Sequence, residues 1–297
     1  IKGPTLMNNE ERGLIAGSCK WIDKVVIGVP YNTTLEVLDE VGAHYAAHGD
    51  DIAYDENGND VYDEIKKKNR MKTFKRTEGI STTNLLGRLM LCSKSNTKEK
   101  EEISNKPLMS KFLTTGWRLR EFCNNKIPKQ GDKVVYIDGA WDVLHPGHIR
   151  TLEYAKSKGD FLYVGIWDDA TTSNTFGFGN PVLSLMERTF NLLSMKYVDD
   201  VVISSPRLIN EDLIKSLGVD LVIGEESNIT VFDKEDPYFV PKQMGVFETY
   251  KSHIALNNDF LVQRLEKNKD SYMNKYFTKT KKEEDYYKNQ KKQTQEI

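Results

Sequence analysis

The 297-residue sequence has little cysteine, almost no net charge and no long apolar run. Its three cysteines lie far apart and form neither a CxxC pair nor a disulfide framework, which favours a reducing compartment. The 42 Lys and Arg residues nearly balance the 44 Asp and Glu residues, which argues against a general basic surface for nucleic acid. No apolar run approaches the roughly 18 residues of a membrane span, and no signal peptide is visible. We therefore expect a cytoplasmic protein without nucleic-acid partners and with room for two domains.

Histidine is also scarce, yet two of the five histidines, His145 and His148, lie in one turn. Residues 133–137 form an apolar run rich in β-branched side chains, which predicts a buried strand, and a helical pattern begins at His148. A helix N-terminus presents free N–H groups that favour phosphate, and histidines there can donate hydrogen bonds to phosphoryl oxygens and add positive charge if protonated. The alternatives are a metal pair, although no Cys, Asp or Glu cluster lies nearby at ligand spacing, and plain surface histidines.

The two histidines complete the string Asp138-Gly-x-x-Asp142-x-x-His145-x-Gly147-His148. This string resembles the signature of the cytidylyltransferases, within the wider HxGH nucleotidyltransferase superfamily. The resemblance implies that His145 and His148 hold a nucleotide triphosphate, and that Ala140 and Trp141 also contact the nucleotide. Strands and helices alternate after the string, which predicts a parallel sheet with ligands at the carboxyl ends of its strands.

The pattern predicts the following elements around this turn. In the first part of the chain we expect a helix at 7–20 capped by Asn8 or Asn9, a strand at 24–29, a helix at 33–39, a strand at 43–47 and a helix at 85–91. After the turn we expect a strand at 161–166, a helix at 183–195, a strand at 200–204, a helix at 211–217 and a strand at 221–223.

The chain also repeats itself at a spacing of 176 positions. Residues 20–27 match residues 196–203 at this spacing, and several identical residues share it. These pairs are Glu11-Arg12 with Glu187-Arg188, Pro30 with Pro206, Gly42 with Gly218, Tyr62 with Tyr238, and Arg88 with Arg264. A counterpart of His145 would fall before residue 1. We therefore expect an N-terminally truncated chain, with a further His-x-Gly-His upstream.

The tandem units resemble the ethanolamine-phosphate cytidylyltransferase family, as do three segments of the first unit. These segments are Lys2-Gly3-Pro4, His48-Gly49-Asp50-Asp51 and Arg76-Thr-Glu-Gly-Ile-Ser-Thr-Thr83. The choline-phosphate cytidylyltransferases have one such unit. The resemblance implies an α/β fold of two tandem Rossmann-like nucleotidyltransferase units with parallel sheets. The predicted division is a first unit at 1–92 that lacks its N-terminal HxGH part, a linker and interdomain segment at 93–130, a second unit at 131–267, and a charged C-terminal tail at 268–297.

The resemblance implies transfer of a cytidylyl group from CTP to phosphoethanolamine, giving CDP-ethanolamine and pyrophosphate. Mg²⁺ would come with CTP, held mainly by phosphates and water. Lys2 would act with the two histidines in catalysis and bridge the phosphates of both substrates. Lys2, Arg12 and Arg188 would bind the substrate phosphate. The nucleotide-binding candidates outside the HxGH turn are His48, Gly49, Asp50, Arg76, Thr77, Ser81, Thr82, Gly224 and Glu225.

The residues leave other interpretations open. Lys2 fits a solvated loop, Arg12 a surface ion pair, Ser81 or Thr82 an ordinary helix cap, and His48-Gly49 a structural turn. Another HxGH nucleotidyltransferase also fits, using choline phosphate or glycerol phosphate or transferring an adenylyl group. An inactive nucleotide-binding fragment is the alternative outside enzymes. Consumption of CTP but not of ATP would separate the nucleotidyltransferases.

The two units are predicted to differ, the first catalysing and the second serving as a degenerate partner. At the spacing of 176, Lys2 faces Phe178 and Gly49 faces Glu225, so a cation is lost and an acid stands where a polyanion would sit. Related single-unit enzymes pair as dimers, by resemblance, so we expect an intramolecular pseudo-dimer. Residues 268–297 are Lys-, Glu- and Tyr-rich and predict a solvated helix or tail, with peripheral contact to the endoplasmic reticulum membrane as the alternative.

Overall fold

The computed structural model describes residues 5–50, 55, 59–75, 82–92, 122–123, 126–177, 179–225, 235–252, 258–274 and 277. The first unit (residues 5–92) contains α1 (Asn9–Gly17), α2 (Leu35–Glu40), β1 (Ala46–Gly49), α3 (Asp63–Lys67), β2 (Met71–Phe74) and α4 (Thr82–Cys92). The second unit, predicted at 131–267, contains β3 (Val134–Gly139), α7 (Pro146–Ser157), β4 (Phe161–Ile166), α8 (Asp169–Phe176), α9 (Leu185–Leu193), β5 (Asp200–Ile203), α10 (Glu211–Leu217), β6 (Leu221–Glu225), α11 (Phe239–Gln243), β7 (Phe247–Tyr250) and α12 (Asn258–Lys267).

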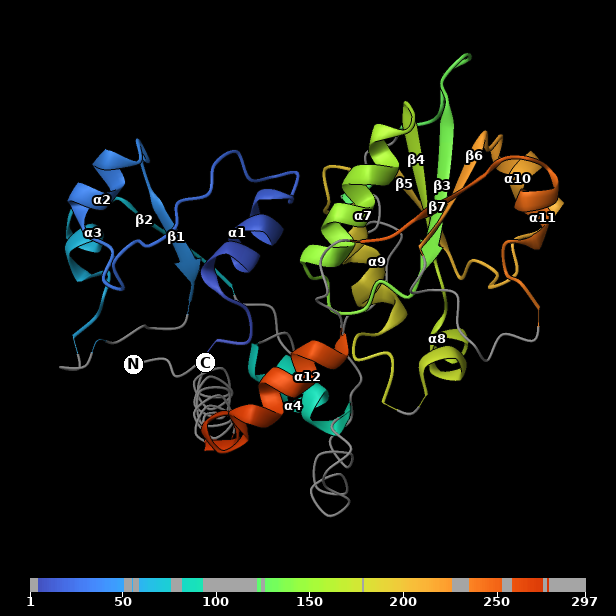
Figure 1. The fold of residues 1–297 in the computed structure, drawn as a ribbon. Helices are drawn as coiled ribbons and strands as arrows, with labels where there is room; N and C mark the ends of the chain where they lie inside the picture. The colour runs from blue at the N-terminus through green and yellow to red at the C-terminus, as the bar shows by residue number, and fades with distance from the viewer. Residues whose placement is uncertain are drawn as a thin grey trace, which may run out of the picture.

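A five-stranded parallel sheet forms the centre of the second unit (Figure 1). Its strand order is β5-β4-β3-β6-β7. Starting from β3, the chain adds β4 and then β5 on one side, and afterwards β6 and then β7 on the other side. The order therefore reverses between β3 and β6. In open α/β sheets, ligands bind in the crevice outside the carboxyl ends of the strands at this reversal.

Helices cover both faces of this sheet because side chains alternate along its buried strands. Val135 and Ile137 of β3 lie in one apolar cluster with residues of α7 and α9. Val134 and Tyr136 lie in a second cluster with residues of α10 and α11. A strand buried on both faces reads as a continuous apolar run, which explains the sequence pattern at 133–137.

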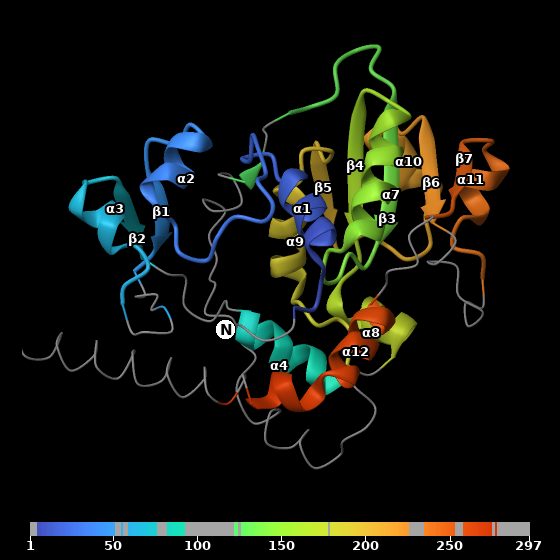
Figure 2. The same cartoon turned by 60° about the vertical axis from the view of Figure 1, so that its left-hand side comes forward.

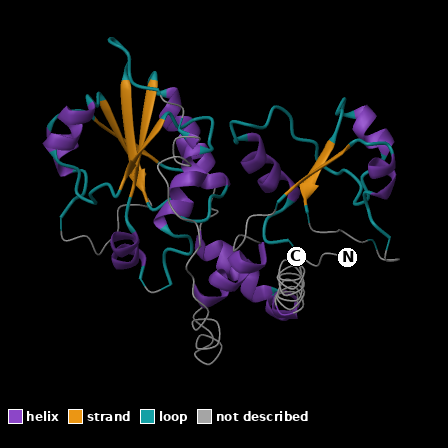
Figure 3. Ribbon diagram, turned by 180° about the vertical axis from the view of Figure 1, so that it is seen from behind, coloured by secondary structure: helices purple, strands orange, loops and turns teal. Residues whose placement is uncertain are grey.

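The first unit contains a smaller, two-stranded parallel sheet of β1 and β2 (Figure 3). The repeat at 176 positions extends to these elements. After a shift of 176 positions, α1, α3 and β2 have the same bounds as α9, α11 and β7. The helices α2 and α4 and the strand β1 differ from α10, α12 and β6 only slightly at their ends. The α/β class with parallel sheets is thus confirmed.

The predicted strand at 24–29 is wrong, because the structure has no strand there. Its counterpart in the second unit, β5, pairs with β4. No described strand of the first unit lies beside residues 24–27, and Val26 and Ile27 are 43% and 55% exposed. A β-branched run without a neighbouring strand has no partner for the backbone N–H and C=O hydrogen bonds of a sheet, so it does not form a strand.

Several predicted helices carry a capping signal within their own sequence. Asn8 caps α1 in a capping box with Glu11, Thr34 caps α2, and Asn210 caps α10. The strand expected at 43–47 lies slightly later, at β1. Within the described residues no helix is both long and apolar enough to cross a membrane.

The two units touch through reciprocal backbone hydrogen bonds. Lys20 N donates to Ser194 O at 2.8 Å, and Lys196 N donates to Ser18 O at 2.9 Å. Cys19 and Met195 form the antiparallel bridge between them. Cys19 and Met195 are 176 residues apart, and the two hydrogen-bonded pairs are 174 and 178 residues apart, so the contact is symmetric about the repeat. Below this contact, α4 and α12 lie side by side in both views (Figures 1 and 2).

Candidate functional site

The HxGH turn lies directly after β3, at the carboxyl edge of the larger sheet. Trp141 and Val143 adopt positive φ angles of 53° and 42°, so the chain between strand and helix is sharply folded. Pro146 begins α7, where the missing N–H costs nothing. His145 is the N-cap, and its Nδ1 accepts from His148 N at 3.4 Å. The turn thus places two imidazoles at the N-terminal end of a 12-residue helix.

The two imidazoles stack on each other, with ring centroids 3.8 Å apart and planes 23° apart. Trp141 lies against His148 at 5.5 Å. Burial lowers the pKa of His145 to about 4, and burial together with the neighbouring His145 lowers the pKa of His148 well below its usual value. Both rings are therefore neutral at pH 7. They can donate hydrogen bonds to phosphate, but they do not add the positive charge that protonated histidines would supply.

His148 Nδ1 is buried and has no hydrogen-bond partner among the described residues. A buried ring nitrogen without a partner is unusual in a folded protein. A neutral imidazole carries one N–H, and its tautomer is set by the hydrogen bonds that it makes. A ligand oxygen at the end of α7 would therefore satisfy a polar atom that the protein itself leaves unmatched.

Two aspartates of the same string hold the turn in place, a role that the sequence pattern did not assign to them. Asp142 accepts from Val182 N at 2.7 Å and from Leu183 N at 2.9 Å. Asp138 is fully buried and accepts from Trp167 Nε1 at 2.8 Å and from Tyr238 Oη at 3.0 Å. Burial raises the pKa of Asp138 to about 6, although both donors act to lower it.

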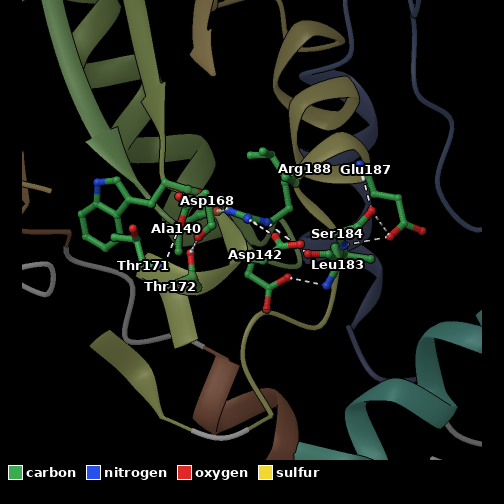
Figure 4. A network of polar contacts seen from close by, with 12 residues as sticks. Ala140, Asp142, Asp168, Thr171, Thr172, Leu183, Ser184, Glu187 and Arg188 are labelled. Carbon is green, nitrogen blue, oxygen red and sulfur yellow. Dashed lines mark hydrogen bonds and ion pairs between the residues drawn. The ribbon is translucent and has the colours of Figure 1, made fainter. Parts of the chain in front are cut away.

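Arg188 is fully buried, and its guanidinium is surrounded by protein oxygens (Figure 4). It donates to Ala140 O at 2.6 Å, to Trp167 O at 2.9 Å and to Leu183 O at 3.1 Å. It also donates to Asp169 Oδ1 at 2.6 Å. This arginine therefore ties the ends of β3 and β4 to α9. Its predicted contact with a substrate phosphate stays a prediction, and the four bonds already occupy four of its five N–H groups.

The end of β6 supplies the remaining candidates of the second unit, Gly224 and Glu225. A Cβ on Gly224 would lie 2.7 Å from Phe247 Cζ, so this position has no room for a side chain. Glu225 Oε1 lies 3.3 Å from Thr151 Oγ1 of α7. A carboxylate is thus held beside the first turns of α7, across the crevice between β3 and β6.

The candidates of the first unit form a separate group. His48 and Gly49 end β1, with His48 Nδ1 3.0 Å from Gly49 O and its ring 5.0 Å from Tyr62. Asp50 follows β1 and is exposed. Figures 1 and 2 both show β1 well apart from α7, so the structure does not bring these residues to the HxGH turn.

The other candidates of the first unit lie on two helices or outside the described residues. Arg12 lies on α1 and is exposed, with Nε 3.4 Å from Asn8 O. Thr82 is the first residue of α4 and is exposed. Lys2, Arg76, Thr77 and Ser81 lie outside the described residues, as does Phe178.

Comparisons with known proteins agree with the repeat and with the HxGH turn. The family model described as cytidylyltransferase-like matches residues 2–88 and again residues 136–286. The ethanolamine-phosphate cytidylyltransferase of Dictyostelium discoideum is 35% identical over 289 residues, which cover 91% of this chain and 80% of that protein. The Arabidopsis thaliana protein of the same name is 33% identical, covering 96% of this chain and 75% of that protein. A probable choline-phosphate cytidylyltransferase of Schizosaccharomyces pombe is 41% identical but covers 30% of this chain.

The extent of these matches separates the two families. The choline-phosphate relative matches 92 residues, whereas the ethanolamine-phosphate relatives match across both units. The chain belongs to the ethanolamine-phosphate cytidylyltransferase family.

Proposed function

We propose that the protein transfers a cytidylyl group from CTP to phosphoethanolamine, giving CDP-ethanolamine and pyrophosphate. The observation that carries this proposal is the similarity to relatives of that name across both units, together with an HxGH turn at the strand-order reversal of a parallel sheet. In the reaction a phosphate oxygen of phosphoethanolamine attacks the α-phosphorus of CTP. The bond from that phosphorus to the pyrophosphate oxygen breaks.

The chemical difficulty is the approach of two anions and the charge that develops on the leaving pyrophosphate. No covalent intermediate is needed, so the protein acts by positioning and by electrostatic stabilisation. Neutral histidines at the N-terminal end of a helix supply N–H donors and the favourable end of the helix dipole. These described histidines belong to the second unit. In the first unit, Lys2 would bridge the phosphates of both substrates.

Mg²⁺ accompanies CTP in this proposal and neutralises part of the triphosphate charge. In the part of the chain that the structure describes, no group of three His, Cys, Asp or Glu side chains could hold a metal ion. That is compatible with a metal held mainly by phosphate and water. The test is the dependence of CTP binding on added Mg²⁺, with a metal-independent affinity counting against this part of the proposal.

The two units divide the work, the first catalysing and the second serving as a degenerate partner. Two differences between equivalent positions support this. Arg12 is exposed on α1, whereas its counterpart Arg188 is engaged by four protein oxygens. Gly49 ends β1, whereas its counterpart Glu225 places a carboxylate beside α7.

The proposed reaction is tested by incubating the protein with CTP, Mg²⁺ and phosphoethanolamine and measuring CDP-ethanolamine. Parallel reactions contain ATP in place of CTP, or choline phosphate or glycerol phosphate in place of phosphoethanolamine. CDP-ethanolamine as the main product supports the proposal. Faster turnover of another pair overturns the substrate assignment. Binding of CTP without any product favours an inactive nucleotide-binding protein.

We also propose that the units form an intramolecular pseudo-dimer and that the protein is cytoplasmic, with peripheral contact to the endoplasmic reticulum membrane. The reciprocal hydrogen bonds at Ser18, Lys20, Ser194 and Lys196 support the pseudo-dimer. Small-angle scattering that shows two lobes moving independently would contradict it. Vesicle flotation tests the membrane contact, which fails if the protein stays with the soluble fraction at every lipid composition.

A further inference from the structure

Four side chains meet at the carboxyl edge of the larger sheet. Asp138 lies near the end of β3, Trp167 directly follows β4, Arg207 lies in the loop after β5, and Tyr238 directly precedes α11. The ends of three neighbouring strands thus contribute to one cluster, at the edge where open parallel sheets bind their ligands. The proposed reaction assigns no role to Trp167, Arg207 or Tyr238.

Three of these side chains surround a buried negative charge. Asp138, Trp167 and Tyr238 are all fully buried. Trp167 Nε1 donates to one carboxylate oxygen of Asp138 at 2.8 Å, and Tyr238 Oη donates to the other at 3.0 Å. Two neutral hydrogen bonds leave the charge of a buried carboxylate uncompensated, so this environment favours a cation beside it.

Arg207 supplies that cation from the same unit. Its guanidinium carbon, Cζ, lies 4.5 Å from the centroid of the Trp167 ring, and its Nε and Nη1 atoms are buried. A guanidinium is attracted to the face of an indole, and the attraction grows when the pair is withdrawn from water. Burial raises the pKa of Asp138 to about 6, and the charge of Arg207 is among the influences that lower it. The arginine therefore lies over the ring that donates to the carboxylate.

The repeat shows that the fold does not require an arginine here. At the spacing of 176, Pro206-Arg207 corresponds to Pro30-Tyr31, and Tyr238 corresponds to Tyr62. The first unit thus keeps the proline and one tyrosine but has an uncharged aromatic residue in place of the arginine. The positive charge at this position belongs to the second unit alone.

We propose that Asp138, Trp167 and Tyr238 form a cage for a small organic cation, which the Arg207 guanidinium occupies as a tethered ligand. Aromatic rings beside an anionic group are a recurrent way to bind such cations. A free alkylguanidinium ion binds in the cage once the arginine side chain is removed. While Arg207 is in place, the second unit is closed to free cations. The inference does not depend on the proposed reaction, because it concerns binding and not turnover.

The test is chemical rescue of Arg207→Ala by N-ethylguanidinium, which replaces the atoms that the substitution removes. Thermal unfolding of the whole chain is followed by circular dichroism, and Arg207→Ala is expected to unfold at a lower temperature than the wild type. At about 20 mM, ten times a dissociation constant of about 2 mM, N-ethylguanidinium should raise the unfolding temperature of the variant by about 3–6 °C. The rise should saturate with concentration.

Three controls separate the cage from general effects of the salt. The wild type should gain nothing, because its cage is filled. N-ethylurea has the same shape without the charge and should not rescue Arg207→Ala. The matched variant Arg150→Ala removes an exposed arginine that pairs with Glu153, and N-ethylguanidinium should not raise its unfolding temperature.

Two further comparisons test the anion and the charge. Asp138→Asn combined with Arg207→Ala should abolish the rescue, because the cage then has no negative charge. Arg207→Lys keeps a cation and should lower the unfolding temperature less than Arg207→Gln, a comparison that holds even if Arg207→Ala does not fold. The inference is overturned by an absent rescue in folded Arg207→Ala, by equal rescue with N-ethylurea or in Arg150→Ala, by rescue that persists without Asp138, or by equal losses in the lysine and glutamine variants.

Discussion

Asp142 gives the sharpest test of how the HxGH turn is held. The carboxylate is 3% exposed and accepts from two backbone amides, Val182 N at 2.7 Å and Leu183 N at 2.9 Å. Replacement by alanine leaves both N–H groups without that acceptor. A fully buried unsatisfied amide costs about 2 kcal/mol and a part-buried one about 1 kcal/mol, so we expect Asp142→Ala to destabilise the second unit by about 3 kcal/mol.

The measurement is urea and thermal unfolding followed by circular dichroism. A loss of about 3 kcal/mol corresponds to a drop of roughly 6–12 °C in unfolding temperature for a unit of this size. Asp132→Ala is the control, because that carboxylate accepts one amide, Lys129 N at 2.9 Å, in an exposed turn. Its effect should stay within about 0.5 kcal/mol. If Asp142→Ala is as mild as the control, the carboxylate does not hold the 182–183 backbone and our account of the turn is wrong.

Three further predictions follow from the site. Gly165→Ala should destabilise by about 3 kcal/mol in urea unfolding, since its Cβ would lie 2.1 Å from Tyr136 Oη and 2.8 Å from Ser205 Oγ; a neutral effect would contradict this packing. The raised pKa of Asp138, about 6, means that the folded state holds its proton more tightly than the unfolded state, so the contribution of this group to stability falls as pH rises from about 4 to 6. Asp138→Asn should flatten that slope, and an unchanged pH profile of unfolding would refute the assignment. Lys2→Ala should lower turnover on the order of 10²-fold while Phe178→Ala should change it little; loss of turnover in His148→Ala with a harmless Lys2→Ala would make the second unit the catalytic one.

The features that the sequence predicted well are those that depend on local chemistry. The cap at Asn8 and the strand at 161–166 each follow from residues within one element. The helix after the turn begins at Pro146, two residues before the predicted start at His148. The strand expected at 24–29 failed because a strand depends on a neighbour that the run itself does not encode.

The candidate site could likewise be predicted only where it depends on local sequence. The string at 138–148 located the turn, but the charge state of His145 and His148 depends on how deeply the fold buries them. The position of Arg188 suggested a phosphate ligand, whereas its bonds to Ala140, Trp167 and Asp169 depend on the meeting of three elements distant in sequence. The roles of Asp138 and Asp142 were likewise invisible, because their partners lie 29 to 100 residues away.

The reciprocal bonds around Cys19 and Met195 have a consequence for how the two halves can change. In a dimer of identical subunits every substitution occurs twice, so a residue that suits one site is imposed on the other. Here the equivalent positions belong to one polypeptide and vary singly, as Cys19 and Met195 themselves do at the point of contact. Gly49 can therefore stay a glycine while Glu225 becomes an acid, and Arg12 can stay at the surface while Arg188 is buried. A symmetric contact thus holds together two halves whose sites are free to become different.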